Sequence, residues 1–173
     1  MRAFVAIDLP PIEGEIPNWL RPEDHLTLHF FEELDFGQIP TVVEAMVEAA
    51  ALFLPFGIEV RGVGAFPSAQ RPRVIWAGLG EGSAAVISIV ERMRKALSSR
   101  GFATENRPFI PHLTLARVRS TRGTAWAGQF LTDPVNASRT WTRSTVTELL
   151  LKESELLPTG PRHTVRERVP LGP

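Results

Sequence analysis

One tetrapeptide, His-Leu-Thr-Leu, occurs twice in this chain of 173 residues. The first copy spans residues 25–28, and the second spans residues 112–115, which begin 87 positions later. An Arg-Pro pair precedes each copy by a few residues. The chain has only four histidines, and two of them begin these repeats. The repeat therefore concentrates the imidazole groups of the chain in two matching segments.

These residue types suit acid–base chemistry on a phosphate ester. Side chains at positions i and i+2 of a strand share a face, so each copy directs one His and one Thr the same way. An imidazole can give or take a proton near pH 7. Two such strands side by side would offer His25, Thr27, His112 and Thr114 to one cleft.

Hydrolysis of a phosphate ester needs two proton transfers at once. A base takes a proton from the attacking water, and an acid protonates the departing oxygen on the far side of phosphorus. His25 and His112 are the candidates for these roles, and the residues alone leave open which is the acid. Thr27 and Thr114 are candidates to bind nonbridging phosphate oxygens. The structural alternative is two buried histidines satisfied by the backbone, and threonines chosen for their β-propensity.

Composition limits the class of protein. The length fits one domain or two small lobes that share a core. The absence of cysteine excludes disulfides, a thiolate zinc site and a cysteine nucleophile, and it fits the cytoplasmic location that we expect. We see no signal peptide and no membrane-spanning segment. No phosphate-binding loop, dinucleotide-binding fingerprint or serine-hydrolase elbow is present.

Charge is divided unevenly between the two parts of the chain. Residues 1–60 hold 2 basic and 11 acidic residues, and residues 61–173 hold 17 basic and 8 acidic residues. Of the 19 basic residues, 17 are arginine, which grips phosphate bidentately and stacks on bases. This pattern is compatible with a nucleic-acid partner, although a solvated basic face is the simpler explanation.

Short strands and helices alternate along the sequence. Hydrophobic patterns predict strands at residues 2–8, 25–31, 56–63, 73–79, 111–119, 143–152 and 163–169. They predict helices at 39–54 and 83–100 and a short one at 124–130. We expect Ser83 to cap the second helix, Gly101 to end it, a turn at 62–64 and another at 158–161. The four prolines of residues 9–24 disfavour a long helix there.

The strands are short, and turns bound them. This pattern favours an α+β fold with antiparallel sheets over a doubly wound parallel sheet. The half-chain spacing of the two motifs suggests a duplication with a pseudo-two-fold axis. We therefore expect two similar lobes, the cleft between them and helices on the outside.

A duplicated His-x-Thr-x, one copy per half, resembles the signature of the two-histidine (2H) phosphoesterase superfamily. The surrounding sequence is similar to the RNA 2′,3′-cyclic phosphodiesterase family, also called 2′-5′ RNA ligase, from residue 1 to about residue 169. The segments that carry the resemblance are residues 1–8, 21–28, 65–67, 72–76, 101–102 and 107–117.

The resemblance implies a single bilobal domain over residues 1–173. It implies metal-independent hydrolysis of an RNA 2′,3′-cyclic phosphate to a 2′-phosphate, with His112 as proton acceptor and His25 as proton donor. It implies no cofactor and a partner that is RNA or a nucleotide with a cyclic phosphate, with no membrane, and we expect a monomer. Some members of the family also join tRNA halves through a 2′-5′ bond, reversibly and without ATP.

The sequence departs from the family pattern in three places. Most relatives carry a helix where this chain has the proline-rich residues 9–24. A lysine is usual at position 29, and a tyrosine is common at position 163, where this chain has His29 and His163. The short segment 9–24 bears on the surface by which substrate enters.

Other residues are candidates for substrate binding. His29 alternates onto the face of His25 and Thr27, and the His25–His29 pair invites a metal, but no third ligand is evident, so we predict no metal site. Arg117 needs a bulge or the strand end to reach the cleft. The remaining candidates are aromatic or imidazole rings that could stack on bases: Phe109, His163, Phe66 and Trp76. Aromatic residues are more often part of the core, and we expect at least Trp76 to pack there.

Three functions fit this sequence. The first is an RNA 2′,3′-cyclic 3′-phosphodiesterase, which the paired motifs favour. The second is the same scaffold acting mainly as a 2′-5′ ligase of RNA halves. The third is a non-catalytic RNA-binding module, which the arginine excess suggests but which has no need of two titrating imidazoles.

Overall fold

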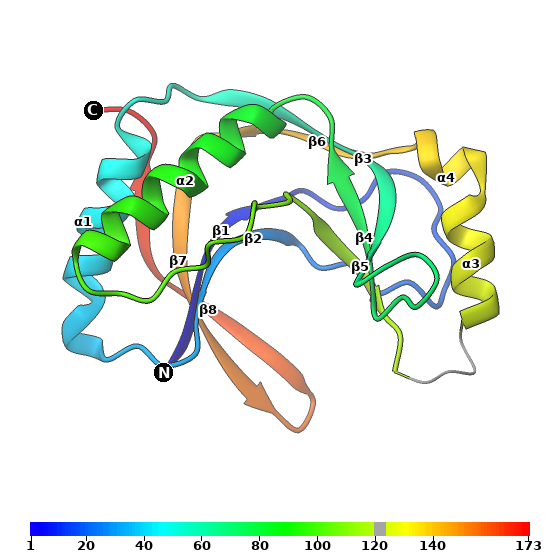
Figure 1. Cartoon of the computed structure of the whole chain (residues 1–173), viewed down its shortest axis with the longest axis horizontal. Coiled ribbons are helices and arrows are strands. Elements are labelled where there is room, and N and C mark those ends of the chain that lie inside the picture. Colours follow the sequence, from blue (N-terminus) through cyan, green and yellow to red (C-terminus); the bar gives the residue numbers. More distant parts are fainter. Residues whose placement is uncertain (120–123) are drawn as a thin grey trace.

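The computed structural model describes residues 1–119 and 124–173. Their strands form two antiparallel sheets of four strands each (Figure 1). Sheet A has the order β2-β1-β7-β8, and sheet B has the order β5-β4-β3-β6. The expected α+β class with antiparallel sheets is confirmed.

The bounds of the elements follow the hydrophobic pattern closely. Sheet A contains β1 (Arg2–Asp8), β2 (His25–Phe31), β7 (Glu148–Leu157) and β8 (Gly160–Pro170). Sheet B contains β3 (Phe56–Phe66), β4 (Val74–Leu79), β5 (Leu113–Arg117) and β6 (Thr140–Val146). The helical elements are η1 (Phe36–Gln38), α1 (Ile39–Ala50), α2 (Ser83–Ser99), α3 (Thr124–Thr132) and α4 (Pro134–Ser138). None of the described helices has the length and apolar run that a bilayer span requires.

Both motif-bearing strands are edge strands. β2 is the outer strand of sheet A and β5 is the outer strand of sheet B, and the two contact each other near the middle of the molecule (Figure 1). The sheets therefore meet along β2, which begins with the first tetrapeptide, and β5, which begins at the second residue of the second copy.

One hydrophobic core joins the sheets and helices. Alternate residues of β1, including Val5 and Ile7, enter the same core cluster as Ile58 of β3 and Ile75 of β4. The helices α1 and α2 pack against each other, and α1 also contacts β7 and β8. On the other lobe, α3 and α4 lie against β3 (Figure 1). This core holds the two sheets as one body.

Most expected boundaries differ from the structure by a few residues, and three of the differences reveal a local feature of the fold. The first helix ends at Ala50 rather than at 54, because Pro55 disfavours helical backbone at Leu54. The strand predicted to end at 63 continues to Phe66, since Gly62, at φ 76°, lies in a bulge within β3 and not in a turn. The strand predicted at 143–152 is two strands, because the chain passes from sheet B to sheet A at Thr147.

The helix ends also differ in part. Gly82, not Ser83, is the N-cap of α2, and it takes a left-handed conformation with φ 83°. Gly101, at φ 86°, follows the end of α2 as expected. The short helix α4 was not anticipated, although Asp133 caps it through Val135 N at 2.9 Å. Residues 9–24 form no helix, as predicted, and residues 158–159 make the turn of the β7–β8 hairpin.

A substitution at Gly82 tests how strongly the α2 start depends on glycine. A Cβ there would lie 2.5 Å from the Gly57 carbonyl oxygen and from Ile58 Cγ2. We expect Gly82→Ala to lower the free energy of unfolding in urea by about 1–3 kcal/mol, through this clash and the left-handed backbone. The matched control is Gly128→Ala in α3, where nothing lies within 4 Å. This variant should gain up to about 1 kcal/mol, and similar changes in both variants would contradict the argument.

Candidate active site between the two sheets

His25 begins β2 and is almost completely buried, with 4% of its surface exposed. Its Nδ1 lies 3.0 Å from Asp24 Oδ1, and its Nε2 lies 3.5 Å from Glu23 Oε2. The ring also packs against Phe4 of β1, with centroids 4.9 Å apart. The hydrogen bond from His25 holds the pKa of Asp24 below its ordinary value. Both nitrogens of the His25 ring thus face carboxylates.

Thr27 shares the face of His25. The register of β1 with β2 pairs Asp8 with His25 and Ala6 with Thr27, and these positions alternate on one side of sheet A. Thr27 is half-buried. The predicted orientation of the first motif is therefore supported by the pairing.

His29 does not share that face. The register shifts between Val5 and Ala6, so that Leu28 is a bulged residue and His29 pairs with Val5, on the side of sheet A that enters the core. The His29 ring packs edge-on against Phe31 at 4.6 Å. The expectation from strict alternation is therefore wrong at His29, because a bulge reverses the side on which the later residues lie.

His112 lies immediately before β5 and is half-buried. Its Nδ1 lies 2.8 Å from the carbonyl oxygen of Ile110, so this nitrogen carries the hydrogen and donates it. In the neutral ring, Nε2 is then the nitrogen with a free lone pair. Phe66 stands edge-on to the ring at 4.9 Å, and Trp76 lies 6.1 Å away.

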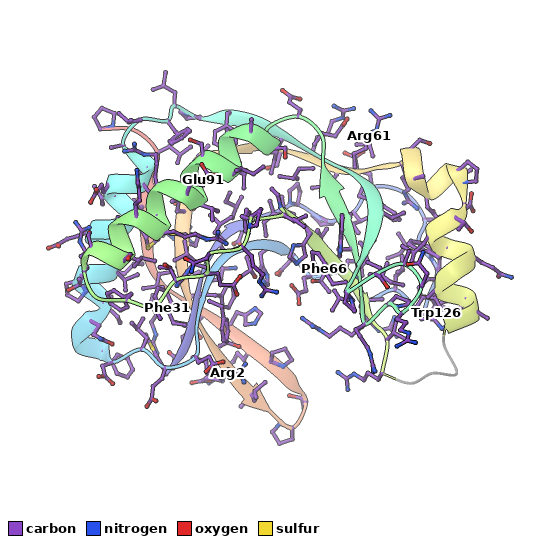
Figure 2. The ribbon with its side chains drawn as sticks, in the orientation of Figure 1. Arg2, Phe31, Arg61, Phe66, Glu91 and Trp126 are labelled. Atoms are coloured by element: carbon purple, nitrogen blue, oxygen red, sulfur yellow. The ribbon has the colours of Figure 1, made fainter. Side chains whose placement is uncertain are left out.

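The packing of Trp76 beside His112 depends on a glycine. A Cβ on Gly64 would lie 2.3 Å from the indole of Trp76, so the indole rests directly on the backbone of β3. Phe66 comes from the end of the same strand and lies toward the middle of the molecule (Figure 2). Phe66 and Trp76, which could have been core residues, therefore flank the second motif histidine.

Thr114 and Arg117 lie on the same side of sheet B. Trp76 pairs with Thr114, Val74 pairs with Arg117, and the register shifts between Ile75 and Trp76. The bulge, at Leu115, brings Arg117 to the face of Thr114. This is the irregularity that the sequence analysis required for Arg117 to reach the cleft.

The segment before the first motif pairs with the strand of the second. The amide of Glu23 donates to the carbonyl of Thr114, and the amide of Arg21 donates to the carbonyl of Leu115, both at 2.9 Å. Glu23 Oε1 also lies 3.3 Å from Arg117 Nη2. Since Glu23 contacts His25 through its other oxygen, one carboxylate joins the two motifs.

Two residues of the C-terminal hairpin complete the surroundings of His25. His163 of β8 is exposed, and its ring lies 5.3 Å from that of His25 and 4.9 Å from that of Phe4. Although the residue as a whole is exposed, partial burial of its imidazole, followed by the charges of His25 and Lys152, lowers the pKa of His163. Lys152 of β7 is 6% exposed and forms an ion pair with Asp8. Lys152 was missed because its position relative to β1 depends on long-range pairing.

Phe109 is placed differently from a stacking residue. It is half-buried and packs against the core cluster. The guanidinium of Arg94 lies 5.9 Å from its ring centroid. One face of the Phe109 ring is thus engaged by the α2 arginine.

Among the described residues, Asp24, His25 and His163 offer three potential metal-ligand atoms within 4.8 Å of one another. The pair considered from sequence, His25 and His29, is divided between the two faces of sheet A. A nitrogen that donates to a carboxylate cannot at the same time coordinate a cation, so the hydrogen bond between Asp24 and His25 competes with metal binding.

The family model of the 2′-5′ RNA ligase superfamily matches residues 17–153. This chain belongs to that superfamily. A member from Archaeoglobus fulgidus, named RNA 2′,3′-cyclic phosphodiesterase, is 32% identical over 180 residues and covers 93% of this chain and 95% of its own. A protein of the same name from Aquifex aeolicus is 29% identical over 158 residues, with 89% of this chain and 81% of its own covered.

Solved structures of two other proteins share this fold. E. coli LigT complexed with 3′-AMP has a TM-score of 0.74 and 25% identity, and the match covers 98% of this chain and 97% of LigT. A protein of Thermus thermophilus, TT0787, has a TM-score of 0.70 and 27% identity, with 99% and 98% covered. The resemblance stated from the two motifs is thereby confirmed.

The position of His29 gives a pH dependence of stability. Burial, together with the positive charge of Arg94, lowers the pKa of His29 from its ordinary 6.5. The unfolded chain then binds this proton at a higher pH than the folded chain, so the free energy of unfolding falls as pH drops below about 6.5. We expect His29→Gln to reduce that fall, as measured by urea unfolding at a series of pH values. An unchanged pH dependence in the variant would refute this assignment.

Proposed function

We propose that this protein hydrolyses the 2′,3′-cyclic phosphate at the end of an RNA to a 2′-phosphate, by a two-histidine mechanism without a metal ion. The observation that carries the proposal is that the two motif histidines have different hydrogen-bond partners, a carboxylate for His25 and a backbone carbonyl for His112. Backbone hydrogen bonds join the segments that hold these two residues. The relatives named RNA 2′,3′-cyclic phosphodiesterase support the choice of substrate.

His112 is the proposed proton acceptor. Because Nδ1 donates to the Ile110 carbonyl, Nε2 of the neutral ring is available to take a proton from a water molecule. The water then attacks phosphorus in line with the bond to the 3′-oxygen. The proton transfer keeps the attacking oxygen nucleophilic as its bond to phosphorus forms.

His25 is the proposed proton donor. A carboxylate accepts hydrogen bonds and does not donate them, so Asp24 and Glu23 together suit a ring with a hydrogen on each nitrogen. That ring can protonate the 3′-oxygen as its bond to phosphorus breaks. In the reverse direction the two histidines exchange roles.

The phosphate oxygens need separate donors. Thr27 and Thr114 are proposed to donate their hydroxyl hydrogens to the nonbridging oxygens, where negative charge builds up in the transition state. Arg117 lies on the face of Thr114 and adds a cation. His163 is proposed to border the substrate through its contact with His25.

We propose that residues 1–173 act as one bilobal domain. Sheet A combines the first two strands of the chain with the last two, so neither half of the chain forms both sheets. We further propose that the protein acts in the cytoplasm, since a chain without cysteine has no use for an oxidising compartment.

Single substitutions of the motif histidines test the mechanism. On a nucleoside 2′,3′-cyclic phosphate, we expect His25→Ala and His112→Ala each to lower kcat by about 10²–10⁴-fold, because each removes one proton transfer. His29→Ala is the matched control, since His29 lies on the other face of sheet A. This control should keep its activity, measured by chromatography of the 2′-phosphate product.

The same assay with EDTA tests the metal-free mechanism. The rate should be unchanged by EDTA, whereas a loss that Zn²⁺ or Mn²⁺ restores would make Asp24, His25 and His163 a functional metal site. Full activity in both motif variants would overturn the two-histidine mechanism. Normal RNA binding by wild type and both variants, without any hydrolysis, would instead favour the non-catalytic binding module.

Ligation through a 2′-5′ bond is a second candidate function, because the matching family model is that of the 2′-5′ RNA ligase superfamily. The same two histidines would act in the same direction, with a 5′-hydroxyl attacking phosphorus in place of water and the 3′-oxygen again leaving. Incubating paired RNA halves, one with a 2′,3′-cyclic phosphate and one with a 5′-hydroxyl, measures the joined fraction at equilibrium. A dominant joined product at micromolar RNA would make ligation the main activity.

A further inference from the structure

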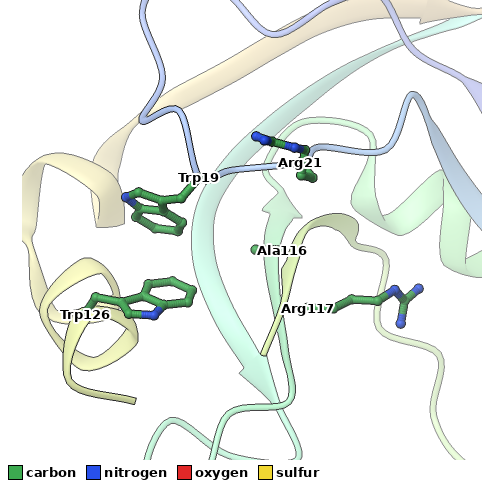
Figure 3. Close-up of a pocket in the computed structure, with 5 residues that line it drawn as sticks. All are labelled: Trp19, Arg21, Ala116, Arg117 and Trp126. Atoms are coloured by element: carbon green, nitrogen blue, oxygen red, sulfur yellow. The ribbon is translucent and has the colours of Figure 1, made fainter. Parts of the chain in front are cut away.

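We propose that a pocket beside the second motif binds the base of the penultimate nucleotide, the one that precedes the cyclic phosphate in an RNA substrate. The pocket has a volume of about 360 Å³ and is lined by Trp19, Arg21, Ala116, Arg117 and Trp126 (Figure 3). This inference rests on the proposed function, since it concerns the RNA that the same site would cleave.

Two tryptophans from distant segments form one wall of the pocket. Trp19 comes from the proline-rich residues 9–24 and Trp126 comes from α3, and their ring centroids are 4.1 Å apart (Figure 3). Trp19 is 39% exposed, although an indole of this size is commonly covered in a folded protein. The pair therefore presents aromatic surface to the pocket.

The wall is supported from behind. Phe130 of α3 is buried and stands edge-on to Trp19 at 5.4 Å. Phe130 in turn packs against Trp141 of β6, which is completely buried, with centroids 6.0 Å apart. A stacking surface held this way loses little side-chain freedom when a base packs against it.

Two arginines line the pocket. Arg21 lines one side, with Nη1 donating to the carbonyl oxygens of Asn18 and Leu20. Arg117 lines the other side, and its guanidinium points away from the two tryptophans (Figure 3). This guanidinium lies 3.3 Å from Glu23 Oε1. Aromatic surface combined with arginine is the pattern that binds single-stranded nucleic acid through base stacking and phosphate contacts.

Arg117 links the pocket to the catalytic groups. Arg117 follows Thr114 by three residues on the same face of β5, a span of at most about 10 Å in extended backbone. Glu23 contacts both Arg117 and the Nε2 of His25. Arg117 therefore lies between a base bound in the pocket and a phosphate bound at the motifs.

The chemistry of the substrate decides which nucleotide can place its base in the pocket. A 2′,3′-cyclic phosphate uses both oxygens at the 3′ end of the RNA, so the terminal nucleotide has a neighbour only on its 5′ side. The base of that neighbour would stack on the tryptophan wall, and the phosphate that joins the two nucleotides would contact Arg117 or Arg21. An RNA end would then be preferred over a cyclic mononucleotide.

The test compares three substrates with wild type and variants. They are uridine 2′,3′-cyclic phosphate, the dinucleotide ApU with a terminal 2′,3′-cyclic phosphate, and the same dinucleotide with its adenine removed. Wild type should show a higher kcat/KM for the complete dinucleotide than for either of the others. The abasic substrate makes this comparison independent of whether any variant folds.

We expect Trp126→Ala to lower kcat/KM for the dinucleotide by roughly 5- to 150-fold, the range for loss of one stacked base. Its rate on the mononucleotide should not change, and Trp126→Phe should retain most of the dinucleotide advantage. The control is Phe36→Ala, which removes another exposed aromatic ring, on η1. That control should behave as wild type on every substrate.

Binding separates failure of this inference from failure of the proposed function. Quenching of tryptophan fluorescence measures the affinity for ApU 2′-phosphate and for uridine 2′-phosphate, whether or not the protein is a phosphodiesterase. Tighter binding of the dinucleotide that disappears in Trp126→Ala supports the pocket. Equal affinities of wild type for the two 2′-phosphates, or equal losses of affinity for both in Trp126→Ala, overturn the proposed pocket even where hydrolysis proceeds as proposed.

Discussion

The site depends on the backbone pairing of residues 21–23 with β5. Both motif strands are sheet edges, and an exposed edge offers unpaired backbone groups to any neighbour. Here, the amide of Arg21 donates to the carbonyl of Leu115 and the amide of Glu23 donates to the carbonyl of Thr114, which occupies that edge of β5. The segment that leads into the first motif is therefore fixed to the strand of the second. A helix in this segment would use its own amides internally, so the extended, proline-rich residues 9–24 suit this pairing.

The two identical tetrapeptides lie in different surroundings in the folded protein. His25 is enclosed by two carboxylates, an aromatic ring and another imidazole, whereas His112 is bonded to a backbone carbonyl and flanked by Phe66 and Trp76. The electrostatic difference comes from residues outside the repeat. Pairing between distant parts of the chain also accounts for the uneven charge of the sequence. Cationic residues after position 60 pair with acidic residues of the first 60, as Arg117 does with Glu23 and Arg100 does with Glu48. Much of the arginine excess thus serves intramolecular contacts and is weak evidence for RNA when taken alone.

The sequence was sufficient to predict the strands, to find the repeated motif and to recognise the family. These predictions rest on the local alternation of hydrophobic and polar residues and on the short segments around each copy of the motif. The sequence was insufficient for the faces of His29 and Arg117, because a single bulged residue in β2 and another in β5 reverse the alternation, and no residue type marks either bulge. His163 reaches His25, and Lys152 reaches Asp8, through the pairing of β1 with β7 and of β7 with β8, which joins the two ends of the chain. The pocket of Trp19 and Trp126 likewise joins segments about a hundred residues apart. Such contacts follow from tertiary packing, which single-sequence patterns do not contain.

The topology of sheet A has a consequence for biosynthesis. β1 and β2 can pair as soon as the first 31 residues leave the ribosome, but the inner edge of β1 stays open until β7, at residues 148–157, is synthesised. His163, on β8, arrives later still. The nascent chain therefore carries both tetrapeptides well before their environment is complete, and hydrolytic competence is among the last properties that translation confers on this polypeptide.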